Sequence, residues 1–157
     1  MKVIVRCIGK TTESYLRQGE EKYRKRLSHY LPVRFEVVPD VRGGGKLSVD
    51  QLRAREAERL LADVTPADRI VLLDEAGEAL TSVAFSQWLE RELQRPAHRL
   101  VFLIGGAFGF GPAVYARADA KLSLSAMTFS HQMVRLFFLE QLYRGMTILR
   151  NEKYHNE

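Results

Sequence analysis

The sequence contains a single cysteine and no long uninterrupted hydrophobic run. Cys7 has no partner for a disulfide within the chain, and no group of cysteines and histidines has the spacing of a zinc site. The longest stretch without a charged residue, 100–116, is broken by four glycines and a proline, which makes it a poor membrane helix. The apolar stretch near the start, 3–5, is too short for a secretory signal. We therefore expect a protein of the reducing cytoplasm, with no membrane segment and no metal.

An excess of one charge sign is also small. The 157 residues include 24 lysines and arginines against 19 acidic residues, a net charge of +5. This excess is compatible with a nucleic-acid partner, but it is also common in proteins that bind none. With 46% hydrophobic and 27% charged residues, the composition is typical of a globular fold and excludes a disordered chain. The length predicts one domain over 1–157.

Hydrophobic patterning predicts strands that alternate with helices. The predicted strands are 3–8, 33–38, 69–74, 99–104 and 121–125. The predicted helices are 12–31, 48–61, 82–93 and 131–144, with Ser48 and Ser82 as caps and Gln51 completing a capping box. A glycine-rich loop is predicted at 39–46. The pattern indicates a three-layer α/β fold with a mostly parallel sheet.

Three segments lie where the carboxyl ends of predicted strands would meet. They are 73–75, the pair Gly105 and Gly106, and 124–128. Ligands of open parallel sheets bind outside this edge. The sequence therefore predicts the ligand site in the loops that follow these strands.

The glycine-rich segment 104–112 does not match the common phosphate-binding patterns. A P-loop needs Gly-Lys-Ser/Thr after its last glycine, whereas this chain has Pro112 after Gly111. The dinucleotide fingerprint needs three glycines at a spacing that no register of this loop supplies. The glycines let a ligand approach the backbone closely, and a simple tight turn is the alternative.

Small and hydroxyl-bearing residues are frequent in 124–130, between the last predicted strand and the last helix. Their amides and hydroxyls suit the uncharged edges of a base. His131 follows, where it can cap the helix, and a structural role for it is favoured over a catalytic one.

The last predicted helix is apolar on more than one side. Its apolar residues are Met133, Val134, Leu136, Phe137, Phe138, Leu139, Leu142 and Tyr143. A helix of this kind is buried on two sides, so we expect it to pack on its own sheet and on a second subunit. A homodimer is favoured, and an interior helix of a monomer is the alternative.

Two polar segments are candidates for contact with RNA. The closing residues include Tyr154 and His155, which offer an aromatic face and a titratable ring to a nucleobase. The other segment is a basic run with an interleaved tyrosine, which can follow a phosphate backbone. Its cations are Lys22, Arg24, Lys25 and Arg26. A solvated chain end and a solvated helix face are the alternatives.

Several groups of residues form a recognisable series. They are Leu73-Asp74, Ile104-Gly105-Gly106, Leu124-Ser125, Met127-Thr128-Phe129, His131-Gln132 and the closing Tyr154-His155. In this order they resemble the RlmH family, ribosomal RNA large-subunit methyltransferases of the SPOUT class, over essentially the whole chain. The chain departs from the family's pattern at Ser130, where proline is usual, and at Ala107 and Phe108. Neither departure removes a side chain assigned to chemistry.

This resemblance implies a C-terminal trefoil knot with S-adenosylmethionine bound in it. The implied cofactor residues are Leu73, Gly105, Leu124, Ser125, Ala126, Met127, Thr128 and Phe129. It also implies a homodimer in which the partner subunit completes the RNA site. The implied reaction is methylation of N3 of a pseudouridine in the helix-69 loop of 23S rRNA, on the assembled 70S ribosome.

Roles for individual residues follow from this implied reaction. Substrate positioning and proton handling are assigned to Tyr154 and His155, and phosphate binding to Arg144 and Arg150. Asp74 and Glu75 are assigned to the cofactor or to a loop cap. Two rival functions make different predictions: a non-catalytic RNA-binding module binds RNA without the cofactor, and a nucleotide-using enzyme built on the glycine loop binds ATP.

Overall fold

The computed structural model describes residues 1–41 and 44–156, so part of the predicted loop 39–46 and the terminal Glu157 lie outside the described residues. Among the described residues, five strands form one sheet in the order β2-β1-β4-β3-β5. The strands are β1 (Lys2–Ile8), β2 (Val33–Val38), β3 (Arg69–Ala79), β4 (Arg99–Ile104) and β5 (Ala120–Ser123). Every neighbouring pair is parallel, which confirms the predicted α/β sheet.

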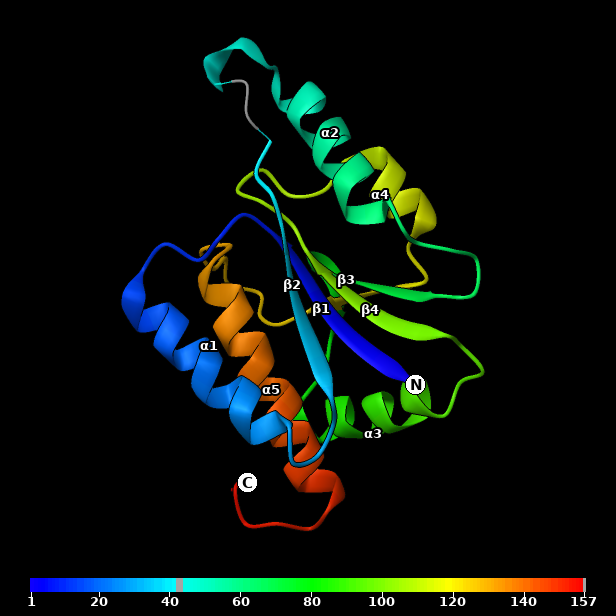
Figure 1. Cartoon of the computed structure of the whole chain (residues 1–157). Coiled ribbons are helices and arrows are strands. Elements are labelled where there is room, and N and C mark those ends of the chain that lie inside the picture. Colours follow the sequence, from blue (N-terminus) through cyan, green and yellow to red (C-terminus); the bar gives the residue numbers. More distant parts are fainter. Residues whose placement is uncertain (42–43, 157) are drawn as a thin grey trace.

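Helices cover both faces of this sheet (Figure 1). One face carries α1 (Ser14–Leu27), α3 (Ser82–Leu93) and α5 (Met133–Leu149). The other face carries α2 (Val49–Leu61) and α4 (Pro112–Arg117), and a single 3-10 turn, Gly44–Lys46, precedes α2. The predicted three-layer arrangement is therefore confirmed.

Successive side chains of the central strands point into two separate apolar cores. Val5 and Phe102 lie in the core under α1, α3 and α5, where the rings of Phe102 and Phe138 are 4.7 Å apart. Ile4 and Leu103 lie in the core under α2 and α4. Because both faces are buried, these strands are apolar at nearly every position.

Helix caps agree with the predictions at one helix and differ at another. Ser48 and Gln51 form the predicted capping box at the start of α2. At α3 the cap is Thr81, whose hydroxyl accepts a hydrogen bond from the Ala84 amide at 3.1 Å. Ser82 was predicted for this role and is instead the first helical residue, because the preceding threonine has the extended backbone that a cap requires.

Element lengths differ from the predictions at several points. α1 is shorter at both ends than the predicted 12–31, and α5 extends to Leu149 rather than to 144. β3 extends to Ala79 because, after a register shift, it pairs with β5 a second time. Gly77 permits this close approach, since a Cβ there would lie 2.6 Å from the Leu122 backbone. The short helix α4 was not predicted.

A buried arginine attaches α5 to the end of β1. Arg135 is fully buried and donates to the carbonyl oxygens of Ile8 at 2.5 Å and Gly9 at 2.7 Å. It also donates to Thr11 Oγ1 at 3.1 Å, and this hydroxyl donates in turn to the Glu20 carboxylate at 2.8 Å. The network joins β1, α1 and α5 at the carboxyl edge of the sheet.

A second set of charged residues forms ion pairs at the opposite side of the sheet, where the amino ends of the strands lie. Arg99, the first residue of β4, places Nη2 2.7 Å from Asp68 Oδ2 and Nη1 2.8 Å from Asp63 Oδ2. The Asp68 side chain is completely buried and also accepts a hydrogen bond from the Thr65 amide at 2.9 Å. The hydrogen bonds from Arg99 hold the pKa of Asp68 well below its usual range.

Replacing this carboxylate tests its contribution to stability. We expect Asp68→Asn to lower the free energy of unfolding at pH 7 by about 2 kcal/mol, the usual size of hydrogen bonds to charged groups. Because the folded-state pKa of Asp68 is lowered, its stabilisation is fully present above the unfolded pKa of about 4 and is lost as the pH falls towards the folded value. Urea unfolding at several pH values should therefore show the variant and the wild type converging in acid. The exposed Glu90→Gln should change stability by less than about 0.5 kcal/mol, and equal stability of Asp68→Asn and wild type at pH 7 contradicts the prediction.

Candidate functional site

The middle of β3, where its pairing with β5 shifts register, and the carboxyl ends of β4 and β5 surround a cavity of about 390 Å³. Its walls come from 73–76, most of 104–110 and most of 122–129, and from His131 and Val134 at the start of α5. These segments include the three strand ends that the sequence predicts would meet, so their juxtaposition is confirmed. A cavity of a few hundred Å³ is of a size that holds small ligands and cofactors.

Nearly all of the predicted cofactor residues line this cavity. The lining members are Leu73, Gly105, Leu124, Ser125, Met127, Thr128 and Phe129. Ala126 is exposed and is not part of the wall.

The glycine loop closes on itself beside the cavity. The Gly109 amide donates to the Gly106 carbonyl at 3.1 Å, and Gly109 has a φ of 75°, in the left-handed region that favours glycine. A Cβ at Gly106 would lie 2.8 Å from Glu56 Oε2 on α2, so a larger residue there would require the Glu56 carboxylate to move. The loop is thus a tight turn and a cavity wall at once, and the two interpretations of its sequence do not exclude each other.

The hydroxyls of the loop after β5 first stabilise the loop itself. Ser123 Oγ donates to the Ser125 carbonyl at 2.9 Å, and Ser125 Oγ accepts from the Met127 amide at 3.0 Å. Thr128 Oγ1 donates to Glu75 Oε1 at 3.2 Å, which connects this loop to the end of β3. The loop therefore forms a fixed wall across the strand ends.

Two buried carboxylate oxygens near the cavity have no hydrogen-bond partner among the described residues. One is Oδ2 of Asp74, which lines the cavity, and the other is Oε1 of Glu56, behind the glycine loop. Burial raises the pKa of Glu56, and nearby Asp40 raises it further. Burial and then the Asp74 carboxylate raise the pKa of Tyr115 to about 12. An unpartnered carboxylate oxygen in a cavity wall favours a ligand that carries hydrogen-bond donors or positive charge.

His131 does not cap α5, so that prediction is wrong. The helix begins after Gln132, which makes no side-chain cap and whose Oε1 instead accepts from the Thr12 amide at 2.9 Å. His131 therefore lies outside the first turn, half-buried in the cavity wall. Burial and the nearby Arg135 lower its pKa, which keeps the ring neutral at pH 7.

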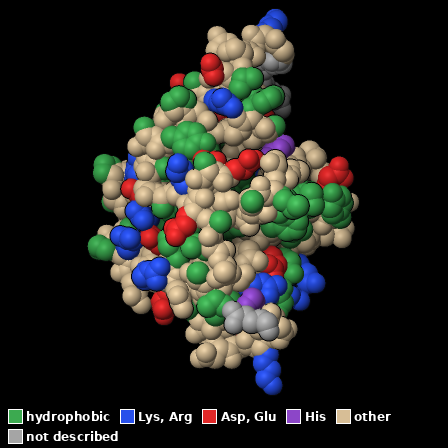
Figure 2. All heavy atoms as spheres, turned by 180° about the vertical axis from the view of Figure 1, so that it is seen from behind, with side chains coloured by type: hydrophobic (Ala, Val, Ile, Leu, Met, Phe, Trp, Pro, Cys, Tyr) green, Lys and Arg blue, Asp and Glu red, His purple; other side chains and the backbone are tan. Residues whose placement is uncertain are grey.

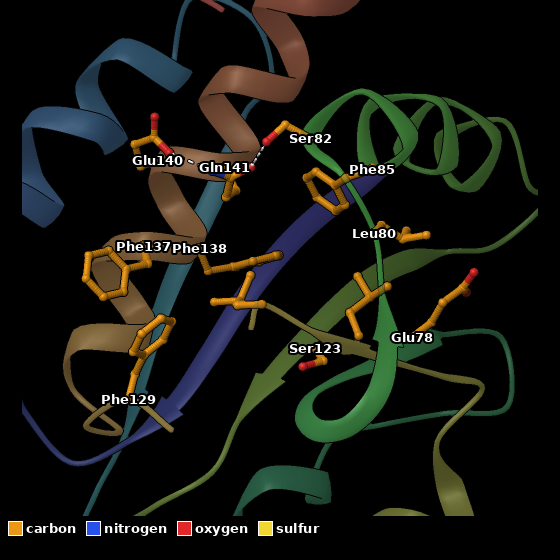
Figure 3. Close-up of a pocket in the computed structure, with 12 residues that line it drawn as sticks. Glu78, Leu80, Ser82, Phe85, Ser123, Phe129, Phe137, Phe138, Glu140 and Gln141 are labelled. Atoms are coloured by element: carbon orange, nitrogen blue, oxygen red, sulfur yellow. Dashed lines mark hydrogen bonds between the residues drawn. The ribbon is translucent and has the colours of Figure 1, made fainter. Parts of the chain in front are cut away.

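A second cavity, of about 290 Å³, shares part of its wall with the first. Figure 3 shows the residues that line it. The residues that line both cavities are Leu122, Ser123, Leu124 and Phe129. Aromatic rings form much of the second wall, where Phe129 and Phe137 meet edge to face at 5.0 Å. Gln141 accepts from Ser82 Oγ at 2.9 Å and donates to Glu140 at 3.0 Å, which gives this cavity a polar end.

The closing residues line neither cavity and are attached to α5. The Tyr154 hydroxyl donates to Glu140 Oε1 at 3.0 Å, and its ring packs edge-on against Tyr143 at 4.7 Å. His155 Nδ1 lies 3.1 Å from a guanidinium nitrogen of Arg144. Burial is the main cause that raises the pKa of Tyr154. The tail is thus an anchored segment rather than a free chain end, and Glu140 connects it to the second cavity.

The predicted RNA-contacting cations do not form one cluster. Arg144 pairs with Glu140, with Nη2 2.6 Å from Oε1, so most of its charge is balanced within the chain. Arg150 lies over the Tyr30 ring at 4.6 Å, and Arg26 lies over the Tyr23 ring at 5.4 Å. The cations of the basic run with exposed side chains are Lys22, Arg24 and Lys25.

Three residues near the cavities were not predicted. Glu56 shares the inward face of α2 with Ala57 and Leu60, so an acid at an inward position was the available signal. Glu140 is likewise the one acid in an otherwise apolar stretch of α5. Tyr115 gave no signal because the short helix that carries it was not predicted.

Two kinds of site are absent from the part of the chain that the structure describes. Within 1–41 and 44–156, no helix is long and apolar enough to span a bilayer. No group of three or more histidine, cysteine or acidic residues in these ranges is arranged to hold a metal ion.

Known proteins of one family are similar to this chain over nearly its whole length. A family model described as "Predicted SPOUT methyltransferase" matches residues 1–155. Proteins named ribosomal RNA large subunit methyltransferase H from Parabacteroides distasonis and Porphyromonas gingivalis are each 48% identical over 157 residues, 100% of both chains. The protein of that name from Christiangramia forsetii is 48% identical over 150 residues, 96% of each chain. The chain therefore belongs to the SPOUT methyltransferases, and among them to the family of ribosomal RNA large subunit methyltransferase H.

Proposed function

We propose that this protein transfers a methyl group from S-adenosylmethionine to N3 of a pseudouridine in the helix-69 loop of 23S rRNA, on the assembled 70S ribosome. Family membership supports methyl transfer, and the names of the relatives support ribosomal RNA as the substrate class. The observation that carries the proposal is the cavity between the middle of β3 and the ends of β4 and β5, whose wall contains nearly all of the positions assigned to the cofactor. A ribosomal substrate would place the protein in the cytoplasm.

The cavity wall suits S-adenosylmethionine in its donor and acceptor groups. The backbone and hydroxyls of Ser125 and Thr128 suit an uncharged adenosine, and the glycines leave room for close approach. The unpartnered Asp74 Oδ2 suits the cofactor's ammonium group or ribose hydroxyls. When bound, the cofactor supplies a methyl group on a cationic sulfur, so the protein mainly has to hold the reactants in line. The residues proposed to hold it are those in the wall, namely Leu73, Gly105, Leu124, Ser125, Met127, Thr128 and Phe129.

The substrate nitrogen must lose its proton during the reaction. We assign proton handling and substrate positioning to Tyr154 and His155, at the anchored tail. Glu140 accepts hydrogen bonds from both Tyr154 and Arg144, so it fixes the tail beside the second cavity. Arg144 and Arg150 are proposed to contact phosphate, and for Arg144 this requires that the Glu140 pair be shared or opened.

The proposed functional form is a homodimer, each chain being one SPOUT domain with a C-terminal trefoil knot. Within one chain α5 is flanked by α1 and α3, which cover part of the apolar surface from which a second subunit was inferred. Phe129 and Phe137 each remain 36% exposed. Figure 2 shows hydrophobic side chains gathered on the face seen from behind. Exposed apolar patches of this kind favour a protein partner, and the proposal assigns it to a second copy.

Methyl transfer to ribosomes tests the proposed function directly. Labelled S-adenosylmethionine is incubated with the protein and 70S ribosomes that lack the modification, with protein-free rRNA in parallel. We expect label on N3 of pseudouridine in ribosomes, identified by mass spectrometry, and little on free rRNA. Cofactor binding without any transfer overturns the substrate assignment. RNA binding without affinity for S-adenosylhomocysteine supports the non-catalytic alternative, and ATP binding supports the nucleotide-using one.

The unpartnered Asp74 oxygen gives a prediction about affinity. We expect Asp74→Asn to weaken S-adenosylhomocysteine binding about tenfold, or about 1.4 kcal/mol, because the variant cannot form a charge-assisted hydrogen bond. Isothermal titration calorimetry measures this, with the exposed Asp50→Asn as a matched control of unchanged affinity. Equal affinities of Asp74→Asn and wild type contradict the role of Asp74 in the cofactor site.

The tail gives a prediction about rate. Tyr154→Phe keeps the ring packed on Tyr143 and removes only the hydroxyl, and His155→Ala removes the imidazole. If these groups act on the substrate, the double variant should lose at least about 100-fold in methyl-transfer rate. Affinity for S-adenosylhomocysteine should stay unchanged, because neither residue lines the cofactor cavity. An unchanged rate would remove the tail from the mechanism.

A further inference from the structure

Many arginines of this chain are balanced by carboxylates. Those in ion pairs are Arg6, Arg34, Arg53, Arg69, Arg95, Arg99, Arg117 and Arg144. A groove between α1 and the edge strand β2 is different. Its cations are Lys10, Arg17, Arg24 and Lys25, and among the described residues none of the four makes a direct ion pair.

Packing and neutral hydrogen-bond acceptors hold two of these cations in place without a direct ion pair. The Arg24 guanidinium lies 5.2 Å from the centre of the Phe35 ring on β2, across the groove. Arg17 Nη1 donates to the carbonyl oxygens of Thr11 at 3.0 Å and Thr12 at 2.6 Å, which are neutral acceptors. Both guanidinium groups are therefore oriented before any ligand arrives, which lowers the entropy that binding would cost.

Acidic residues in the groove offset these cations only in part. Glu20 is buried, and both of its carboxylate oxygens accept from Thr11 Oγ1, at 2.8 and 3.0 Å. Burial raises its pKa, whereas the hydrogen bond from Thr11 and the positive charges of Arg135, Arg24 and Arg17 act in the opposite direction. Glu21 is the exposed acid of this surface. The open part of the groove thus has a clear excess of positive charge.

The cations form a row rather than a single anion pocket. Arg17 and Arg24 are separated by two helical turns, about 10 Å along the axis of α1. Lys10 extends the row from the turn after β1, and Lys25 lies beside Arg24. Arg17 is held at the carbonyl oxygens of Thr11 and Thr12, and Arg24 is held at the Phe35 ring, so the two lie at different points along the groove. A nucleic-acid strand, which presents a phosphate at every nucleotide, suits such a row.

We propose that this groove, formed by Lys10, Arg17, Arg24 and Lys25 against Phe35 and Val37, binds the phosphate backbone of an RNA strand. The inference deepens the proposed function and rests on it for the identity of the RNA. The groove contains only part of the basic run that the sequence predicts to bind RNA. Arg26 of that run packs on tyrosine rings instead, and Lys10 and Arg17, which lie outside the run, line the groove. Phosphate contacts fix the position of an RNA without reading its sequence.

The test compares two variants that lower the net charge equally. Arg24→Gln with Lys25→Gln removes two cations of the row, and Arg55→Gln with Arg91→Gln removes two exposed cations on α2 and α3. Binding of a labelled single-stranded RNA of mixed sequence is followed by fluorescence anisotropy over a range of NaCl concentrations. We expect the groove variant to flatten the slope of log K against log[NaCl] by about 1.4, or about 0.7 for each phosphate that the variant no longer neutralises. The control variant should keep the wild-type slope.

Other results would overturn the inference. Equal slopes for the two variants mean that net charge rather than the groove binds RNA. Equal competition by polyglutamate, with the same dependence on the groove cations, assigns the groove to an acidic protein segment instead. Failure of the proposed function can be told apart from failure of this inference. A wild-type protein that binds RNA through the groove but methylates no ribosome contradicts the proposed function and leaves the inference standing. If both hold, the groove variant should raise KM for ribosomes and leave kcat and S-adenosylhomocysteine affinity unchanged.

Discussion

The position of the last helix depends on one buried guanidinium group. Arg135 has no exposed surface, and its partners are two carbonyl oxygens at the end of β1 and the Thr11 hydroxyl. A buried cation without such partners would cost several kcal/mol, so α5 is strongly favoured to begin at this place. The chain between β5 and α5 must consequently fold back across the strand ends. That return forms part of the wall of the cavity beside Leu73 and Gly105.

The two edges of the sheet use polar groups in opposite ways. At the amino edge, Arg99, Asp63 and Asp68 satisfy one another, and Arg6 joins them through Asp63. At the carboxyl edge, Asp74 retains a buried oxygen with no partner among the described residues. A satisfied network stabilises the fold, whereas an unsatisfied acceptor beside a cavity lowers stability until a ligand supplies a donor. The edge that costs stability is thus the one equipped for binding.

Sequence patterns predicted the centre of the sheet well because β1, β4 and the first part of β3 are buried on both faces and are therefore apolar at nearly every position. They also predicted that the strand ends at 73, 105 and 124 meet, since parallel topology alone brings these ends to one edge. The N-cap of α3 was harder to predict. Thr81 and Ser82 are both residue types that cap helices well, and only the backbone geometry selects between them. Hydrophobic periodicity also cannot predict contacts between different segments of the chain. Examples are the contact of Glu56 with Gly106 and the hydrogen bond from Arg17 to Thr11. A knot is likewise a property of chain threading, to which hydrophobic spacing is blind.

The turn after β1 belongs to two proposed sites at once. Thr11 accepts from Arg135, which positions the wall of the cofactor cavity, while its carbonyl holds Arg17 of the groove. One residue, Thr11, is thus hydrogen-bonded to an arginine on each side. If RNA lies in the groove, the protein fixes the distance between the phosphate bound there and the base that is methylated. A fixed distance of this kind selects the target by the separation of phosphate and base in the folded RNA. A site of identical sequence with a different separation would remain unmodified.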